Sequence, residues 1–118
     1  MQYLLMLYAD SSGWAKMSKT EQEQGVAAYH AYTQALKTAG VWVGSNRLQD
    51  VDTATTVRVV DGKSQVLDGP YVETKEQLGG YYLIEAADLD EATAIAGRIP
   101  SVSTGSVEVR PIVAMERP

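Results

Sequence analysis

Residues 3–9, YLLMLYA, limit the fold more than any other stretch because they are apolar at every position. A strand with one face in water would alternate apolar and polar residues. An uninterrupted apolar run is typical of a central strand that is covered on both faces. We therefore expect a β-sheet with protein on each side of this strand.

Capping signals predict two helices. Ser18 and Glu21 have the spacing of a capping box, and the helix that they start should run to Gly40. Its expected buried positions recur at three- and four-residue steps: Val26, Tyr29, Thr33 and Leu36. Asp88 caps a second helix, which Pro100 cannot continue.

The remaining β-prone runs are residues 41–45, 53–60, 63–69, 80–86 and 106–115. Asp61 and Gly62 predict a hairpin turn between the second and third of these runs. Residues 10–17 are expected to form a loop. Residues 74–77 have capping-box spacing, which predicts a single helical turn that tertiary contacts must hold.

The order of elements is βαββαβ with one inserted hairpin. This order predicts a single α+β domain over residues 1–118, with a ferredoxin-like antiparallel sheet and both helices on one face. The other face would then be bare although the strands are apolar on both sides. A second copy would cover it, so we predict a homodimer with its sheets face to face.

Composition argues against several classes of protein. The net charge of −5, without a basic cluster, argues against nucleic-acid binding. The chain has no cysteine and one histidine, so neither a thiolate nor a multi-histidine metal site is expected. The first apolar run meets Asp10 too early to span a membrane, and the cytoplasm is the default location. Gly79 and Gly80 precede a strand, so they do not form a phosphate loop, and no cofactor is expected.

The stretch DGPYVETKEQLGGYYLIE, from Asp68 to Glu85, resembles the central motif of the YCII-related family, in the branch named for an Asp-Gly-Pro-Phe signature. The resemblance extends to YLLMLYAD, TVRVVDG, DLDEATAIAGRIP and VEVRPI, and Tyr71 replaces the Phe of the signature. It implies a dimeric α+β barrel. The resemblance also implies that related members are encoded beside sigma factors. It further implies a His and Asp pair in the wider family, and the position of that His corresponds to Tyr29 here rather than to His30.

Asp68 is the candidate catalytic residue. A Gly-Pro turn would set its carboxylate at the mouth of a pocket between the helices, where partial burial would suit it to proton transfer. The alternative is a turn residue whose carboxylate accepts backbone amides. The candidate ligand-binding residues are Tyr8, Arg58, Glu73, Lys75, Tyr81 and Arg110. The arginines have a structural alternative, which is pairing with Asp68, Glu73 or Glu108.

Three functions remain open from the sequence. The first is a small enzyme that uses acid–base chemistry on an aromatic or carbonyl-bearing metabolite. The second is a non-catalytic dimer that binds a ligand or a protein in a stress response. The third is a cofactor-free monooxygenase that uses Trp42, Asn46 and His30.

Overall fold

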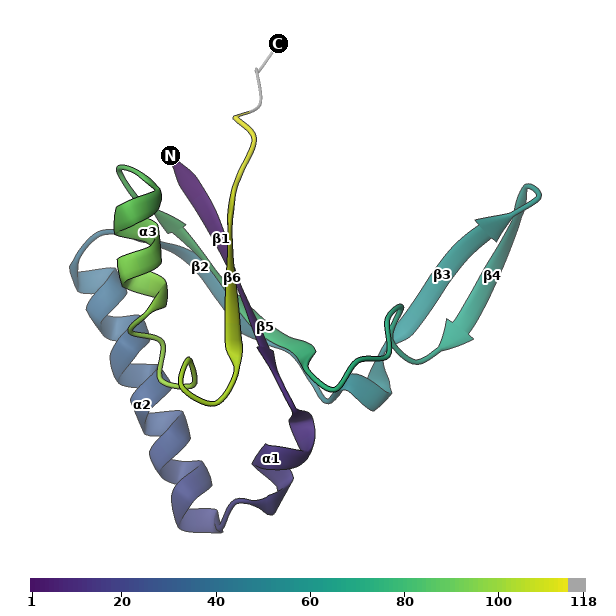
Figure 1. Ribbon diagram of the computed structural model, residues 1–118, viewed down its shortest axis with the longest axis horizontal. Coiled ribbons are helices and arrows are strands. Elements are labelled where there is room, and N and C mark those ends of the chain that lie inside the picture. The colour runs from purple at the N-terminus through teal and green to yellow at the C-terminus, as the bar shows by residue number, and fades with distance from the viewer. Residues whose placement is uncertain (115–118) are drawn as a thin grey trace.

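A computed structural model describes residues 1–114 of the chain, and its centre is a four-stranded antiparallel sheet (Figure 1). The strand order is β2–β5–β1–β6, with β1 at Gln2–Ala9, β2 at Trp42–Arg47, β5 at Gln77–Glu85 and β6 at Ser106–Pro111. The first strand is therefore central, as its uninterrupted apolar run predicts. This order confirms the α+β, ferredoxin-like fold.

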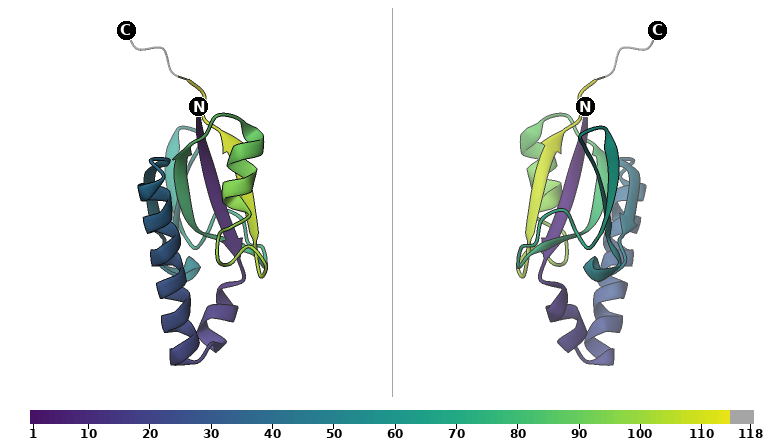
Figure 2. Two further views of the ribbon diagram at one scale, coloured as in Figure 1. Left: turned by 90° about the vertical axis from the view of Figure 1, so that its left-hand side faces the viewer. Right: turned by 90° about the vertical axis from the view of Figure 1, so that its right-hand side faces the viewer.

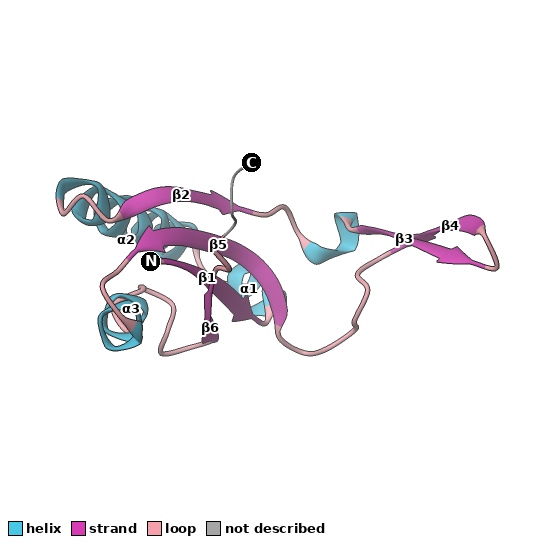
Figure 3. Cartoon of the chain, turned by 90° about the horizontal axis from the view of Figure 1, so that it is seen from above, coloured by secondary structure: helices cyan, strands magenta, loops and turns pink. Residues whose placement is uncertain are grey.

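Helices α2 (Lys19–Thr38) and α3 (Leu89–Ala96) cover one face of this sheet (Figures 2 and 3). Both start at the predicted caps. The Ser18 hydroxyl accepts a hydrogen bond from the Glu21 amide, and the Glu21 carboxylate accepts one from the Ser18 amide, each at 3.1 Å. The Asp88 carboxylate accepts from the Glu91 amide at 2.9 Å.

The core lies between the sheet and these two helices. Its fully buried side chains include Leu5 of β1, Ile84 of β5 and Ile99 after α3. Leu36 is the one buried residue of α2, while the predicted core position Val26 is 54% exposed. The prediction was wrong for Val26 alone, because the less exposed side of α2 includes Tyr29, Thr33 and Leu36, as predicted, and continues through Gly25 and Gln22.

Two local predictions were also wrong. Residues 10–17 form helix α1 (Ser11–Lys16) rather than a loop, because the Asp10 carboxylate caps it by accepting from the Ser12 amide at 3.0 Å. Residues 74–77 form no helical turn. There the Thr74 hydroxyl donates to the Glu76 carbonyl at 2.5 Å, and Gln77 already belongs to β5.

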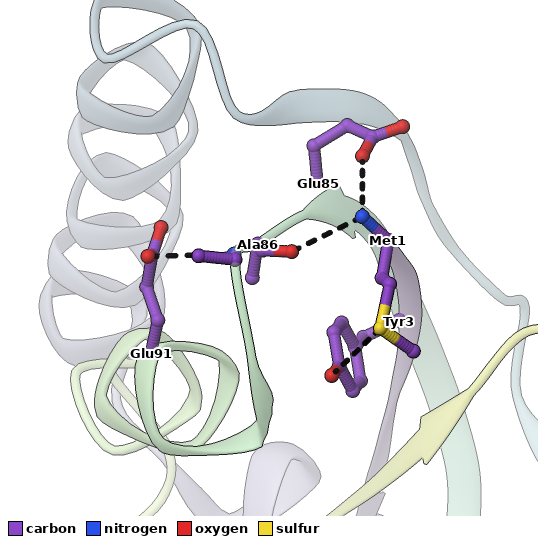
Figure 4. Close-up of polar contacts among 6 residues, drawn as sticks. Met1, Tyr3, Glu85, Ala86 and Glu91 are labelled. Atoms are coloured by element: carbon purple, nitrogen blue, oxygen red, sulfur yellow. Dashed lines mark hydrogen bonds and ion pairs between the residues drawn. The ribbon is translucent and has the colours of Figure 1, made fainter.

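The start of β1 is fixed to the end of β5 (Figure 4). The Met1 amino group donates to the Ala86 carbonyl at 3.2 Å and lies 3.3 Å from the Glu85 carboxylate. The Glu91 carboxylate accepts from the Ala87 amide at 3.4 Å, which joins α3 to the same corner. At the C-terminal end, β6 stops at Pro111, whereas the predicted strand continues to residue 115. Residues 112–114 are not in a strand, and residue 115 lies outside the described residues.

The inserted hairpin consists of β3 (Thr55–Val60) and β4 (Lys63–Asp68), preceded by the short 3₁₀ helix η1 (Val51–Thr53). It projects from one end of the main sheet, on the side away from α2 and α3 (Figures 1 and 3). Asp61 and Gly62 form its turn with positive φ angles of 52° and 75°, as the Asp-Gly pair predicts. The hairpin forms its own two-stranded sheet.

Candidate functional site

The face of the main sheet opposite to α2 and α3 is called the open face. Within residues 1–114, no helix covers it (Figure 2). Along β1, the residues Tyr3 and Leu5 point into the core, so Leu4, Met6 and Tyr8 point to the open face. The Tyr8 hydroxyl lies 3.9 Å from the Met6 sulfur, which agrees with this alternation.

Strand register extends the open face on both sides of β1. Leu83 and Tyr81 of β5 lie opposite Leu4 and Met6, while Arg110 and Glu108 of β6 lie opposite the same two residues on the other side. Apolar side chains therefore form the middle of the face. Polar groups flank them.

Two polar pairs occupy these flanks. The Asn46 side-chain amide of β2 donates to the Tyr81 hydroxyl at 2.8 Å. On the other edge, the Arg110 guanidinium forms an ion pair with the Glu108 carboxylate. An apolar floor with a few oriented polar groups is the usual composition of a small-molecule site. The amide and guanidinium can donate to oxygen atoms of a ligand, and Glu108 supplies a proton acceptor.

Three of the predicted ligand-binding residues, Tyr8, Tyr81 and Arg110, thus share the open face. Arg110 also forms the kind of ion pair that was the structural alternative for the arginines, because it pairs with Glu108. Glu108 itself was predicted only as a possible partner for an arginine. Its alternation with Val107 and Val109, which pack on the core, is the sequence signal that puts it on this face.

Asp68 lies at the end of β4, at the base of the hairpin, with an exposed side chain. The prediction that it stands at the mouth of a pocket between the helices was wrong, because the hairpin projects away from them. The Gly-Pro turn beside it is real: Gly69 has a φ of 101°, and its amide donates to the Ala54 carbonyl at 2.7 Å. This turn closes the base of the hairpin.

Arg58 lies on the face of the hairpin opposite to Asp68. The register pairs Arg58 with Gln65 and Asp68 with Thr55, and alternate positions of a strand point to opposite faces. The Arg58 guanidinium lies 5.9 Å from the centre of the Tyr71 ring. Arg58 and Asp68 therefore do not form one site within a single chain.

Glu73 and Lys75 are exposed in the loop that returns from the hairpin to β5. Hydrogen bonds from Ser12 lower the pKa of the Asp10 carboxyl, and the charge of Lys75 adds a smaller effect. This effect indicates that the loop passes near the start of α1. The neighbouring Glu76 accepts from the Ser106 hydroxyl at 3.4 Å, which ties the loop to β6.

The space between the sheet and α2 is filled by a second group of hydroxyl-bearing residues. The Tyr32 hydroxyl donates to the Ile95 carbonyl at 2.7 Å, and the Thr33 and Tyr82 hydroxyls are 2.8 Å apart. Tyr29 hydrogen-bonds to Ser101. Burial raises the pKa of Tyr32 and of Tyr82. The Tyr32 hydrogen bond joins α2 to α3, and the bond between Thr33 and Tyr82 joins α2 to β5.

The family-model comparison matches the description "YCII-related domain" over residues 1–116. The chain belongs to the YCII-related family. An uncharacterized protein of Rhizobium meliloti (strain 1021) is 40% identical over 114 residues, which cover 95% of this chain and 92% of the relative.

A solved structure that resembles this YCII-related chain is 5-chloro-2-hydroxyhydroquinone dehydrochlorinase (TftG) from Burkholderia phenoliruptrix AC1100, in complex with 2,5-dihydroxybenzoquinone. The TM-score is 0.54 at 15% identity, and the match covers 96% of this chain and 94% of that chain. At this identity the likeness shows the common fold.

His30 is exposed and lines a shallow groove between α1 and α2, together with Trp14 and Val26. Trp42 packs against the core and Asn46 lies on the open face, so the structure does not bring Trp42, Asn46 and His30 together. The trio expected for a monooxygenase is therefore not assembled.

Two further features bear on the class of the protein. Among the described residues, no group of three or more His, Asp and Glu side chains is placed to hold a metal ion. Over the same part of the chain, no helix is both long and apolar enough to cross a membrane.

Proposed function

We propose that this YCII-related protein is a homodimeric enzyme that binds a small aromatic or carbonyl-bearing metabolite on the open face and transfers protons on it. The observation that carries the proposal is the composition of that face. Apolar side chains lie between the Asn46–Tyr81 pair and the Glu108–Arg110 pair. A second copy would enclose this surface and remove it from water, which strengthens its polar interactions.

The proposed roles follow from the chemistry of these groups. Met6 and Tyr8 provide an apolar surface for a ring. The Arg110 guanidinium binds an oxygen on which negative charge develops, and the Tyr81 hydroxyl donates to a second oxygen. The Glu108 carboxyl group gives a proton to a ring carbon of the ligand, next to the oxygen that Arg110 holds. It then takes a proton from the same carbon as negative charge returns to that oxygen, so that a ring hydrogen is exchanged.

The other predicted site residues lie outside this surface in a single chain. Asp68 serves as the catalytic carboxylate only if the hairpin of a second copy carries it to the open face. Glu73 and Lys75, in the exposed loop that follows the hairpin, would contribute in the same way. Arg58 lies on the face of the hairpin opposite to Asp68, so it would not reach the open face together with Asp68. The proposal includes no cofactor, no nucleic acid and no membrane, and it assigns the protein to the cytoplasm.

The ligand class is supported by the structural neighbour. The dehydrochlorinase named above is described in complex with 2,5-dihydroxybenzoquinone, a planar ring that carries hydroxyl and carbonyl oxygens. Such a ring matches the apolar floor and the two flanking polar pairs of the open face. We therefore choose 2,5-dihydroxybenzoquinone as the first probe.

The test is a calorimetric titration of this probe, combined with nuclear magnetic resonance detection of exchange of its ring hydrogens for deuterium. We expect binding and faster exchange with the native protein. Arg110→Met should weaken binding at least about tenfold. Glu108→Gln should preserve binding and abolish the acceleration, whereas the exposed control Arg98→Met should alter neither.

Failure to bind this probe or any other small hydroxylated quinone would overturn the proposed ligand class. Binding that Arg110→Met leaves unchanged would overturn the site. The second candidate function is a non-catalytic binding dimer, which the pairing of Glu108 with Arg110 favours because it occupies the carboxylate. Binding without any accelerated exchange, in the native protein and in Asp68→Asn alike, would favour this second function.

A further inference from the structure

The hairpin β3–β4, here called the arm, has two chemically different faces. Residues that pair across its strands share a face, so Val57 and Val66 lie together, with Val59 beside them. This valine face also carries Thr55 and Asp68 at the base of the arm. The opposite face carries Arg58, Gln65 and Lys63, with Val60 and Leu67.

The valine face is exposed in the single chain. Val57, Val59 and Val66 are 63%, 68% and 67% exposed. A hairpin of two strands is marginally stable in water unless further protein packs against it. Each strand also has an unpaired edge, and exposed apolar edges favour association. The arm therefore needs a partner surface to be stable in this conformation.

The position of the arm indicates where that partner lies. The molecule measures 50 × 48 × 19 Å. Seen down its shortest axis in Figure 1, the helices α2 and α3, the main sheet and the arm follow one another from left to right. Figures 1 and 3 show the arm on the side of the sheet that carries the open face. A molecule packed on the open face would therefore lie beside the arm as well.

We propose that the arm is a dimerisation element that packs its valine face on a second copy of the chain and turns Asp68 toward that copy's open face. The inference rests on the homodimer of the proposed function and adds the contact that completes it. In a two-fold symmetric pair, each arm would embrace the other copy. Asp68 would then be supplied to each site by the partner.

Area considerations favour this arrangement. Four strands about 4.8 Å apart and about six residues long give the open face a footprint of about 400 Å². The two strands of the arm add about 200 Å² on one face. Stable interfaces bury about 800 Å² of accessible surface on each partner, so the sheet alone is small for this purpose and the arm enlarges it by about half.

The charges of the arm and of the open face do not oppose a second copy as the occupant. The chain carries a net charge of −5, so two copies repel each other at long range. The arm has two basic residues, Arg58 and Lys63, and two acidic residues, Asp61 and Asp68. It therefore adds no net charge to the interface. The open face also balances Glu108 against Arg110.

The first experiment is sedimentation equilibrium of the full chain. The double variant Val57→Lys, Val66→Lys places two charges on the valine face and should weaken the dimer at least about tenfold. Gln65→Lys makes the same change next to Val66 on the opposite face and should leave the dimer intact. Circular dichroism of each variant checks that the main sheet and helices still form.

A second experiment locates the contact, and the lack of native cysteine makes it specific. Ser64→Cys on the valine face is labelled with a photoreactive maleimide and mixed with isotope-labelled chains. Cross-links should join Ser64→Cys to β1, β5 or β6 of the other copy. The same label on Gln65→Cys should give markedly fewer such products.

The outcomes separate this inference from the proposed function. A native dimer that is unaffected by the double variant, or cross-links confined to single chains, would overturn the role of the arm while leaving the face-to-face dimer in place. If Leu83→Lys on the open face disrupted the dimer and the arm variants did not, the role of the arm would also be overturned, and the face-to-face dimer would stand. A native protein that is monomeric at all concentrations would overturn both.

Discussion

Asn46 and Tyr81 lie opposite each other on β2 and β5, and the Asn46 amide donates a hydrogen bond of 2.8 Å to the Tyr81 hydroxyl on the open face. In a single chain this bond is exposed to water, so its net contribution to stability is about 0.5 kcal/mol. In a face-to-face dimer the same bond is buried. Removing one partner would then leave a buried donor unsatisfied.

The first prediction follows from this difference. Tyr81→Phe should lower the free energy of unfolding by about 1–3 kcal/mol when the protein is dimeric, and by much less when it is diluted to monomer. Urea denaturation at several protein concentrations measures both values. Tyr71→Phe, at a position 75% exposed, is the control and should show no such dependence. A loss from Tyr81→Phe that is the same at every concentration would contradict burial of this bond.

The two adjacent glycines at the start of β5 give a second prediction. A Cβ atom at Gly80 would lie 2.9 Å from the Asn46 carbonyl oxygen, whereas at Gly79 the nearest neighbour, the Leu7 carbonyl oxygen, is 4.0 Å away. Gly80→Ala should therefore force β2 and β5 apart and destabilise the protein by about 1–3 kcal/mol. Gly79→Ala should change stability by less than about 1 kcal/mol. Thermal unfolding compares the two, and equal effects would contradict the close approach.

These glycines also illustrate how far the sequence leads. The double glycine predicts close backbone approach, and the structure confirms it for Gly80 alone, because only the register with β2 decides which glycine faces a backbone. The capping residues Ser18 and Asp88 predict where α2 and α3 begin, since each cap depends on a residue three positions away. Residues 74–77 have the same spacing without a helix, because local hydrogen bonds cannot hold one turn unaided.

The candidate site was less predictable for a related reason. Tyr8, Tyr81 and Arg110 could be selected by residue type, but their shared face depends on which strands are neighbours. The sequence does not specify the direction in which a hairpin leaves its sheet, so the pocket between the helices that it predicts for Asp68 is wrong. The alternation of Glu108 with Val107 and Val109 indicates that it points away from the core, but its position opposite Met6 depends on the register of β6 with β1, which no local pattern encodes.

A third prediction concerns the acid side of the stability profile. Hydrogen bonds from the Ser18 amide and hydroxyl lower the pKa of the Glu21 carboxyl below its value in the unfolded chain. A lowered pKa means that the stabilising contribution is present above the unfolded value, about 4.3, and is lost as the pH falls through the folded value. Glu21→Gln should therefore be less stable than the native protein near pH 7 and approach it in acid.

Urea denaturation across the acid range measures this difference. Glu23→Gln lies on the same helix outside the capping box and serves as the control for the loss of one negative charge. Its stability difference from the native protein should vary less with pH. If the Glu21→Gln difference persisted unchanged to the lowest pH at which the protein folds, the capping carboxylate would not be the cause.

The last prediction concerns the alkaline side, where Tyr32 and Tyr82 hold α2 to the sheet. Their rings meet edge to face with centres 5.2 Å apart, and burial raises the pKa of both hydroxyls. In the unfolded chain tyrosine ionises near pH 10, so above that pH the folded state retains more protons than the unfolded state. Stability should be complete below about pH 10 and fall as the pH rises further.

Near-ultraviolet absorbance of tyrosinate follows this titration. Among the seven tyrosines of the chain, we expect Tyr32 and Tyr82 to ionise only when the protein unfolds. Tyr82→Phe should remove one of these late protons and flatten the decline in stability, whereas the control Tyr71→Phe, at a position 75% exposed, should leave the decline unchanged. If all seven tyrosines ionised together while circular dichroism still showed the folded helix content, Tyr32 and Tyr82 would not be shielded from water, and the contact between α2 and β5 would be looser than their hydrogen bonds indicate.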